Sequence, residues 1–249
     1  MRCRYLALPI AMFFGHVALA QSPIRVLASN GMRTVVEQLK PAAEKATGQD
    51  LAIEYNSTTG LKPKLESGSG YDVAIVTTEA MSELVKSGKI APKSRVDVAR
   101  GAIGIGVRAG APKPDIKTTA AIKQALLNTK AVSYAQDGAS RAAIEKMFAD
   151  LGIADQMKPK IKLEQGSVRA GGRVAAGNAD FVITLESEIL PIKGVDLVGP
   201  LPAQYQGYVS FSAGVAANAV NPFQATTLVK FLASPANAAV YKSMGLEAR

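Results

Sequence analysis

The chain has 249 residues, of which 48% are hydrophobic and 20% are charged, the composition of an ordinary globular protein. Lys and Arg outnumber Asp and Glu by 29 to 20, which gives a formal net charge of +9. The only cysteine is Cys3 and the only histidine is His16, and both lie in a segment with the pattern of a removable leader. The rest of the chain therefore excludes thiolate or imidazole catalysis, disulfides and zinc sites of the usual Cys/His kind.

Residues 1–20 have the pattern of a secretory signal peptide. Two arginines precede an apolar stretch over residues 5–14, and residues 18–20 supply a small-residue cleavage pattern. Cleavage before Gln21 removes twenty residues and the two arginines, which leaves 229 residues with a formal charge of +7. The apolar stretch is too short to span a membrane. The sequence therefore predicts export to the periplasm.

Short β-branched runs alternate with helix-like segments after the leader, a pattern typical of βαβ units. In the first part we expect strands at residues 24–28, 51–55 and 71–76, and helices at residues 35–46, 59–67 and 79–86. Gly48, Gly68 and Gly88 follow these helices as stop signals. Residues 102–108 alternate small and aliphatic side chains, which predicts a strand that leaves this part of the molecule.

A loop with two prolines, residues 109–114, precedes a second α/β series. This series has expected strands at residues 131–135, 161–163, 181–183 and 195–198 and a helix at 142–151, and two helices at 222–231 and 235–244 end the chain. Residues 208–216 form a run long enough to return to the first part. The sequence predicts an α/β fold with one lobe from residues 22–103 plus 213–249 and a second lobe from residues 104–212. Two crossover segments would join the lobes around a hinged cleft.

Four strand-to-helix turns are rich in glycine and hydroxyl side chains. They are Ser29-Asn30-Gly31, Asn56-Ser57-Thr58-Thr59-Gly60, Asp137-Gly138-Ala139-Ser140-Arg141 and Gln165-Gly166-Ser167-Val168-Arg169. Helix capping explains any one of them alone. Two such turns in each lobe, at the strand ends where α/β sheets bind ligands, instead favour N–H groups and hydroxyls that surround an anion.

Charged and aromatic residues near these turns have two interpretations each. Arg141 and Arg169 are planar cations suited to carboxylates, or else solvated helix residues. Glu186, at the end of a predicted strand, and Tyr208, at the second crossover, either approach the cleft or serve in an ion pair and in hinge packing. Because the basic residues are scattered and aromatic residues make up only 6% of the chain, we expect a small anion as partner and no nucleic acid.

Over nearly all of its mature length, the chain resembles the periplasmic molybdate-binding family of type II solute-binding proteins. The positions that match are the strand 24–29 with Asn30, the pair Thr58-Thr59, the strand Asp72-Val73-Ala74-Ile75, the turn Gly138-Ala139-Ser140, and Val168 as a further backbone donor. The resemblance implies a type II periplasmic binding protein fold that binds a small oxyanion or polycarboxylate for the membrane component of an ABC transporter. Neither a resident metal nor an organic cofactor is expected.

One position departs from this family's pattern. Where molybdate binders have a tyrosine that contacts the oxyanion, this chain has Thr184, and Arg141 and Arg169 flank the pocket positions. The extra arginines point toward a ligand with several carboxylates. The same resemblance covers periplasmic aconitate isomerase, which implies an alternative function: proton transfer between cis- and trans-aconitate, with Glu186 or Tyr208 as the base. An exported structural or adhesion module is a third class that the sequence leaves open.

Overall fold

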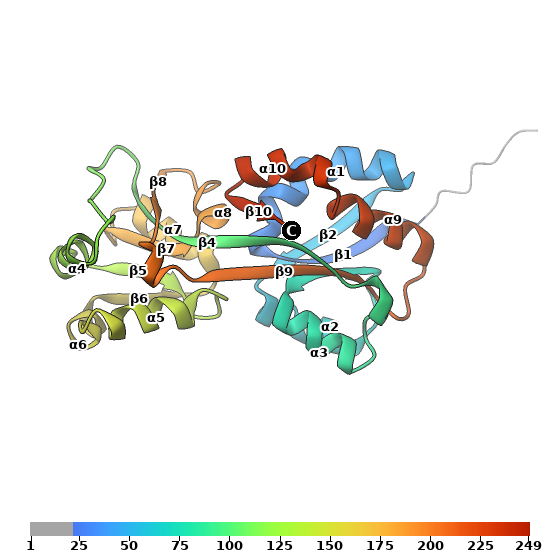
Figure 1. Ribbon diagram of the computed structural model, residues 1–249, viewed down its shortest axis with the longest axis horizontal. Coiled ribbons are helices and arrows are strands. Elements are labelled where there is room, and N and C mark those ends of the chain that lie inside the picture. Colours follow the sequence, from blue (N-terminus) through green and yellow to red (C-terminus); the bar gives the residue numbers. More distant parts are fainter. Residues whose placement is uncertain (1–21) are drawn as a thin grey trace, which may run out of the picture.

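The computed structural model describes residues 22–249, so the leader expected at residues 1–20 lies outside the described residues. Two α/β lobes lie end to end, and the long strands β4 (Val96–Arg108) and β9 (Tyr208–Val215) run side by side between them (Figure 1). This arrangement confirms the predicted α/β fold with two lobes and two crossover segments. No helix within the described residues is long and apolar enough to cross a membrane.

Lobe 1 combines the first part of the chain with its C-terminal tail. Its elements are β1 (Ile24–Ser29), α1 (Arg33–Thr47), β2 (Leu51–Asn56), α2 (Thr58–Ser67), β3 (Val73–Thr77), α3 (Thr78–Lys86), α9 (Pro222–Leu232), α10 (Ala238–Ser243) and β10 (Leu246–Ala248). Strand β1 pairs in parallel with β2 and β3, and β9 runs antiparallel between β3 and β4. Helices α1, α9 and α10 cover one face of this sheet and α2 and α3 cover the other (Figure 1).

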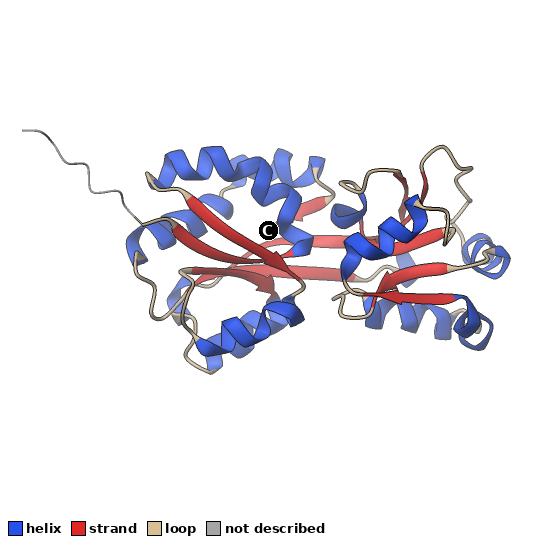
Figure 2. Ribbon diagram, turned by 180° about the vertical axis from the view of Figure 1, so that it is seen from behind, coloured by secondary structure: helices blue, strands red, loops and turns tan. Residues whose placement is uncertain are grey.

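Lobe 2 is built on the second α/β series. Its elements are α4 (Thr119–Asn128), β5 (Val132–Ala135), α5 (Arg141–Asp150), α6 (Ala154–Met157), β6 (Ile161–Glu164), α7 (Gly166–Ala175), β7 (Phe181–Leu185), α8 (Glu186–Ile189) and β8 (Val195–Pro200). Strand β5 pairs in parallel with β6 and β7, while β7 and β8 run antiparallel to the second half of β4. Helices lie outside the strands in both lobes (Figure 2).

Burial explains why these segments adopt their elements. Every residue of β3 and β7 is buried, as expected for strands that helices cover on both faces. Helix α1 buries Val35, Val36, Leu39 and Ala43, which recur at helical spacing, and ends at Gly48 with a left-handed φ of 69°. Continuous apolar runs therefore form the strands that are covered on both faces, and apolar residues at helical spacing determine which face of α1 is buried.

Some elements differ from the sequence-based prediction. Strand β4 begins at Val96 rather than at residue 102, because its first half carries Asp97 and Arg100 among apolar residues and so hides the strand pattern. The three residues of β10 pair antiparallel with β4, and this long-range pairing leaves no local signal. Because β4 and β9 are continuous strands of both lobes, the lobe boundaries at residues 103 and 213 stay a prediction.

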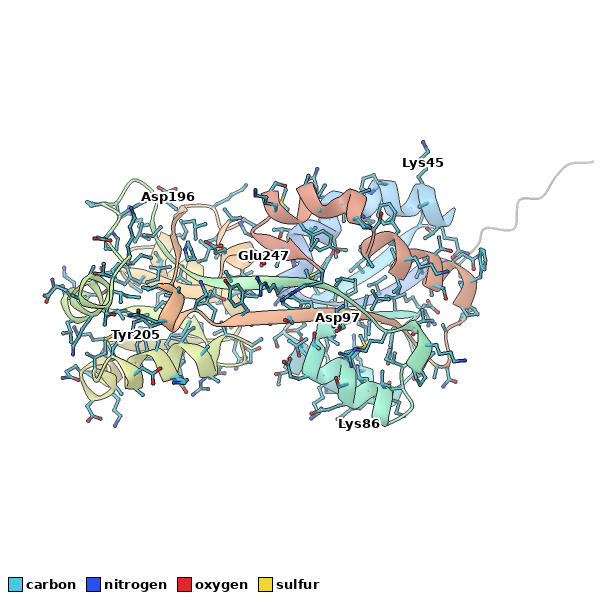
Figure 3. The ribbon with its side chains drawn as sticks, in the orientation of Figure 1. Lys45, Lys86, Asp97, Asp196, Tyr205 and Glu247 are labelled. Carbon is cyan, nitrogen blue, oxygen red and sulfur yellow. The ribbon has the colours of Figure 1, made fainter. Side chains whose placement is uncertain are left out.

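Arg100 joins three segments at the middle of the crossover strands. Its guanidinium pairs with Glu247 of β10 at 2.6 Å and lies 4.3 Å from the ring centroid of Tyr208 on β9. Figure 3 places Glu247 beside the crossover strands. These contacts tie the C-terminal strand to both crossovers on the lobe 1 side of the hinge.

Asp72 anchors the start of β3. Its fully buried carboxylate accepts hydrogen bonds from the backbone N–H of Arg25 at 2.9 Å and of Val220 at 2.7 Å, and from the Arg25 guanidinium at 3.3 Å. Burial alone would raise the pKa of Asp72, but these hydrogen bonds and the Arg25 charge outweigh it and hold the pKa below its usual value.

We expect Asp72→Ala to lower the free energy of unfolding by about 3 kcal/mol, because it leaves two buried N–H groups and a cation without their acceptor. The lowered pKa means that the carboxylate stabilises the fold above its unfolded pKa of about 4 and stops doing so as the pH falls below that value. Urea unfolding from pH 3 to pH 7 measures both effects. The exposed Asp50→Ala serves as the control, and an equal loss in both variants would contradict this role.

Candidate functional site

The two lobes meet where their parallel strands end. In lobe 1, Ser29 ends β1 and Ser57 follows β2; in lobe 2, Ala135 ends β5 and Gln165 follows β6. Helices α2, α5 and α7 begin just after three of these strands. Since the first N–H groups of a helix have no acceptor within the helix, the carboxyl ends of both sheets direct backbone donors toward the seam between the lobes.

A small cavity lies in this seam. Residues from both lobes line it: Ser29, Asn30, Gly31, Ser57, Thr58, Ala135, Gly138, Ala139, Ser140, Gly166, Ser167, Leu185, Glu188 and Phe211. Its volume is about 20 Å³, roughly the space that one water molecule needs. Gly31 of lobe 1 allows Leu185 of lobe 2 to approach closely, because a Cβ at Gly31 would lie 2.9 Å from a Leu185 methyl group. The lobes are therefore closed on one another.

Hydrogen bonds between side chains and backbone hold the lobes together. Ser57 of lobe 1 caps helix α2 by accepting from the Gly60 N–H at 2.9 Å, and its hydroxyl donates to Asp137 of lobe 2 at 2.8 Å. The other Asp137 oxygen accepts from the Gly166 N–H at the start of α7, at 3.0 Å. On the opposite side of the cavity, the Ser187 hydroxyl donates to the Gly31 carbonyl at 2.9 Å.

The cavity is lined by neutral donors. The hydroxyls of Ser29, Ser140 and Ser167 belong to buried residues, and Ser140 makes no capping hydrogen bond to its own helix α5. Among residues 22–249, none that lines the cavity is Lys or Arg. Hydroxyls and helix N-terminal N–H groups of this kind can bind a small anion without a cation. Within the described residues, no group of three or more His, Cys, Asp or Glu side chains is placed to hold a metal ion.

Glu188 is the one ionisable side chain among the residues described as lining the cavity. Burial raises the pKa of its carboxyl, and the nearby charge of Asp137 acts in the same direction. Hydrogen bonds from the Thr184 and Ser167 hydroxyls and from the Leu185 N–H oppose this shift without reversing it. The cavity thus contains a carboxyl that retains a proton more readily than an ordinary glutamate.

The structure brings together five of the sequence-predicted ligand residues. Ser29, Asn30, Thr58, Ala139 and Ser140 all line the cavity. A sixth candidate, Thr184, lies directly behind it and donates its hydroxyl hydrogen to Glu188.

The other candidates lie outside the cavity lining. Arg141 donates to Glu145 at 2.8 Å and to the Gln136 carbonyl at 3.0 Å, whereas Val168 and Arg169 are exposed on α7. Glu186 packs over Gly104 of β4, and burial raises the pKa of its carboxyl. The contacts of these four side chains with a ligand stay predictions.

A larger groove adjoins the cavity and shares Thr58, Gly138 and Ala139 with it. The groove has a volume of about 680 Å³ and extends between α2 and α3 toward Tyr208. Thr59 and Tyr208, two further sequence candidates, line this groove rather than the cavity. A ligand longer than a simple oxyanion would therefore extend past Thr59.

Sequence analysis missed several residues of the site. Ser57, Asp137 and Ser167 belong to turns that were singled out, but the bridge between the lobes became evident only from the distances. Glu188 follows the Glu186 candidate by two residues and Thr184 by four. An acidic side chain in the first turn of the helix that follows the strand Phe181–Leu185 is the local signal that could have found it.

Comparison with known proteins agrees with this geometry. The model of the family described as bacterial extracellular solute-binding protein matches residues 24–247. A protein named aconitate isomerase, from Pseudomonas sp, is 32% identical to this chain and the alignment covers 97% of this chain and 95% of that protein.

Solved structures share the fold. The periplasmic molybdate-binding protein of Azotobacter vinelandii superposes with a TM-score of 0.75 at 19% identity, covering 90% of this chain and 98% of that one. The sulfate-binding protein SubI of Mycobacterium tuberculosis gives a TM-score of 0.69 at 18% identity, covering 91% and 86%. At these identities, the structural likeness establishes the arrangement of the two lobes and nothing about the ligand.

We expect Ser57→Ala to open the cleft, because it removes the hydrogen bond to Asp137, and the ratio of closed to open molecules should fall about tenfold for a bond worth roughly 1.4 kcal/mol. Small-angle X-ray scattering of the ligand-free protein should give a larger radius of gyration than for the wild type. Thr118→Ala is the matched control, since Thr118 caps α4 in the same way but makes no bond between lobes. An unchanged radius of gyration in Ser57→Ala would contradict the role of the Ser57–Asp137 hydrogen bond in holding the lobes together.

Proposed function

The chain belongs to the bacterial extracellular solute-binding protein family, and we propose that it binds a small oxyanion or polycarboxylate in the cavity between its lobes and delivers it to an ABC-type importer. The observation that carries the proposal is the cavity lining: hydroxyls and helix starts from both lobes converge on one point, with no Lys or Arg among them. The expected leader and this family membership support a periplasmic location.

Contacts between a ligand and both lobes would also explain why the lobes close. An anion that accepts hydrogen bonds from Ser29 and Thr58 on one side and from Ser140 on the other interacts with both lobes only when they are together. Because a ligand shifts a conformational equilibrium by its difference in affinity for the two states, such a ligand favours the closed form. Opening about β4 and β9 would admit it.

The proposed ligand residues differ in where they lie relative to the cavity. Ser29, Asn30, Thr58, Ala139 and Ser140 have the support of their place in the cavity lining. The other sequence candidates are Thr59 in the groove, Thr184 behind Glu188, and Arg141, Val168 and Arg169 outside the cavity. For Arg141 to clamp a carboxylate, its guanidinium would have to leave Glu145.

A second function, aconitate isomerisation, is favoured by one observation: a carboxyl with a raised pKa lines the cavity of a protein 32% identical to an aconitate isomerase. Moving the double bond of aconitate requires a base that removes a proton next to a carboxylate. The sequence candidates for this base are Glu186 and Tyr208, neither of which lines the cavity.

Proton NMR of cis-aconitate in heavy water separates the two functions. We expect the protein to broaden the aconitate lines at stoichiometric concentration, because both polycarboxylate binding and isomerisation require that aconitate binds. New olefinic signals at a catalytic protein concentration would assign the isomerase function, whereas broadening alone would assign the binding function. Lines that are neither broadened nor converted would exclude aconitate as the ligand and turn the search to oxyanions such as molybdate and sulfate.

A further inference from the structure

Glu188 holds an unusual place among the carboxyl groups of this protein. It faces a cavity formed by both lobes and accepts hydrogen bonds from Thr184 on β7, Ser167 on α7 and the Leu185 N–H. These three donors hold the carboxyl group in place. The side chain is therefore oriented as a functional group would be, rather than as a solvated surface residue.

The charged group that acts on Glu188 is negative, and the nearby cations have other partners or lie in solvent. Asp137 is the charged residue that acts on it, and Asp137 is already engaged with Ser57 and Gly166. Charged side chains on the elements packed against α8 have other partners or lie in solvent. Arg33 lies over the Tyr55 ring, Arg100 pairs with Glu247, and Arg173 pairs with Glu164. Asp196 accepts from the Gly110 N–H, and Arg108 and Arg169 are exposed. No cation of the described cavity lining offsets the Glu188 charge.

An anion that enters this cavity meets a carboxyl at close range. If Glu188 were ionised, the anion would experience like-charge repulsion from Glu188 and Asp137 in a cavity that leaves little room for water to screen the charges. A protonated Glu188 removes this repulsion and supplies an O–H donor to the anion. We propose that Glu188 is the proton-carrying group of the cleft, which exchanges its proton at the bound anion.

This inference rests on the proposed anion site and extends to the isomerase alternative. There, Glu188 must lose its own proton before it acts, and the repulsion from the bound tricarboxylate makes the ionised carboxylate a stronger base. It removes a proton from the methylene carbon of aconitate, and the electron pair of that C–H bond moves toward the adjacent carboxylate and double bond. Glu188 then returns the proton to the former vinylic carbon at the other end of the three-carbon unit. One proton leaves and one returns, so the step needs no oxidant or co-reactant.

A carbon-13 NMR titration tests the assignment without any ligand. In protein labelled at the glutamate side-chain carboxyl carbons, one resonance that disappears in Glu188→Gln should titrate at a higher pH than an ordinary glutamate carboxyl, because burial raises the pKa of Glu188. Thr184→Val should move the same titration higher, since it removes a hydrogen bond to the ionised form. A Glu188 resonance that titrates at the ordinary value would overturn the proposal.

Deuterium exchange into trans-aconitate tests the catalytic role. If the wild type catalyses exchange, Glu188→Gln should lower the rate at least a hundredfold, with Glu54→Gln on the exposed face of β2 as the surface control. Retained exchange in Glu188→Gln together with its loss in Glu186→Gln would overturn the assignment in favour of Glu186. If the wild type catalyses no exchange, the isomerase function fails, and the titration alone decides whether Glu188 carries the proton.

Discussion

The hydrogen-bonded bridge from Ser57 through Asp137 to Gly166 defines the closed molecule. Asp137 places one carboxylate oxygen on the first N–H of α7, where the helix dipole favours a negative charge, and the other on a hydroxyl from the opposite lobe. This one side chain therefore connects the residue that caps α2 to the first residue of α7, and so holds the two lobes together. The cavity, and the proposal that it binds an anion, follow from that closure.

The electrostatics of the site differ from those of a site built on arginine clamps. Its lining supplies hydroxyls, helix starts and one proton-retaining carboxyl, so charge complementarity comes from oriented dipoles rather than from cations. Selectivity in such a site depends on the protonation state of the ligand as well as on its size, because Glu188 can donate only when it carries a proton. The adjoining groove then determines how long a ligand the closed lobes admit.

The sequence predicted the fold well because the fold depends on local periodicity. Short β-branched runs and helices ended by Gly48, Gly68 and Gly88 located most of lobe 1, and similar signals located the strands and helix α5 of lobe 2. Helices α4, α6 and α8 of lobe 2 were not predicted. Strand β10 and the first half of β4 were missed because their pairing is long-range and their sequences carry charges. Lobe boundaries cannot be read from a strand that belongs to both lobes.

For the site, the sequence located the turns better than the side chains. The turns at Ser29-Asn30, Thr58 and Ala139-Ser140 do meet at one cavity, because parallel strands end at a common edge. The acidic candidate at Glu186 lies outside that cavity, while Glu188 faces it; two residues on a helical turn point roughly 200° apart, and only the exact phase of α8 separates them. Arg141 pairs with Glu145 one helical turn away, a local interaction that competes with any ligand.

The central claim is that the cavity between the lobes is the anion site. Calorimetric titration of the protein without its leader, using molybdate, sulfate and trans-aconitate, tests it most directly when repeated on Ala139→Trp. Ala139 is exposed and lines both the cavity and the groove, so the larger side chain fills the site without disturbing the core. The account predicts that at least one of these anions binds with one site per chain and that Ala139→Trp weakens it at least a hundredfold. Equal affinity in the two proteins, or no binding of any of the three anions to the wild type, would contradict it.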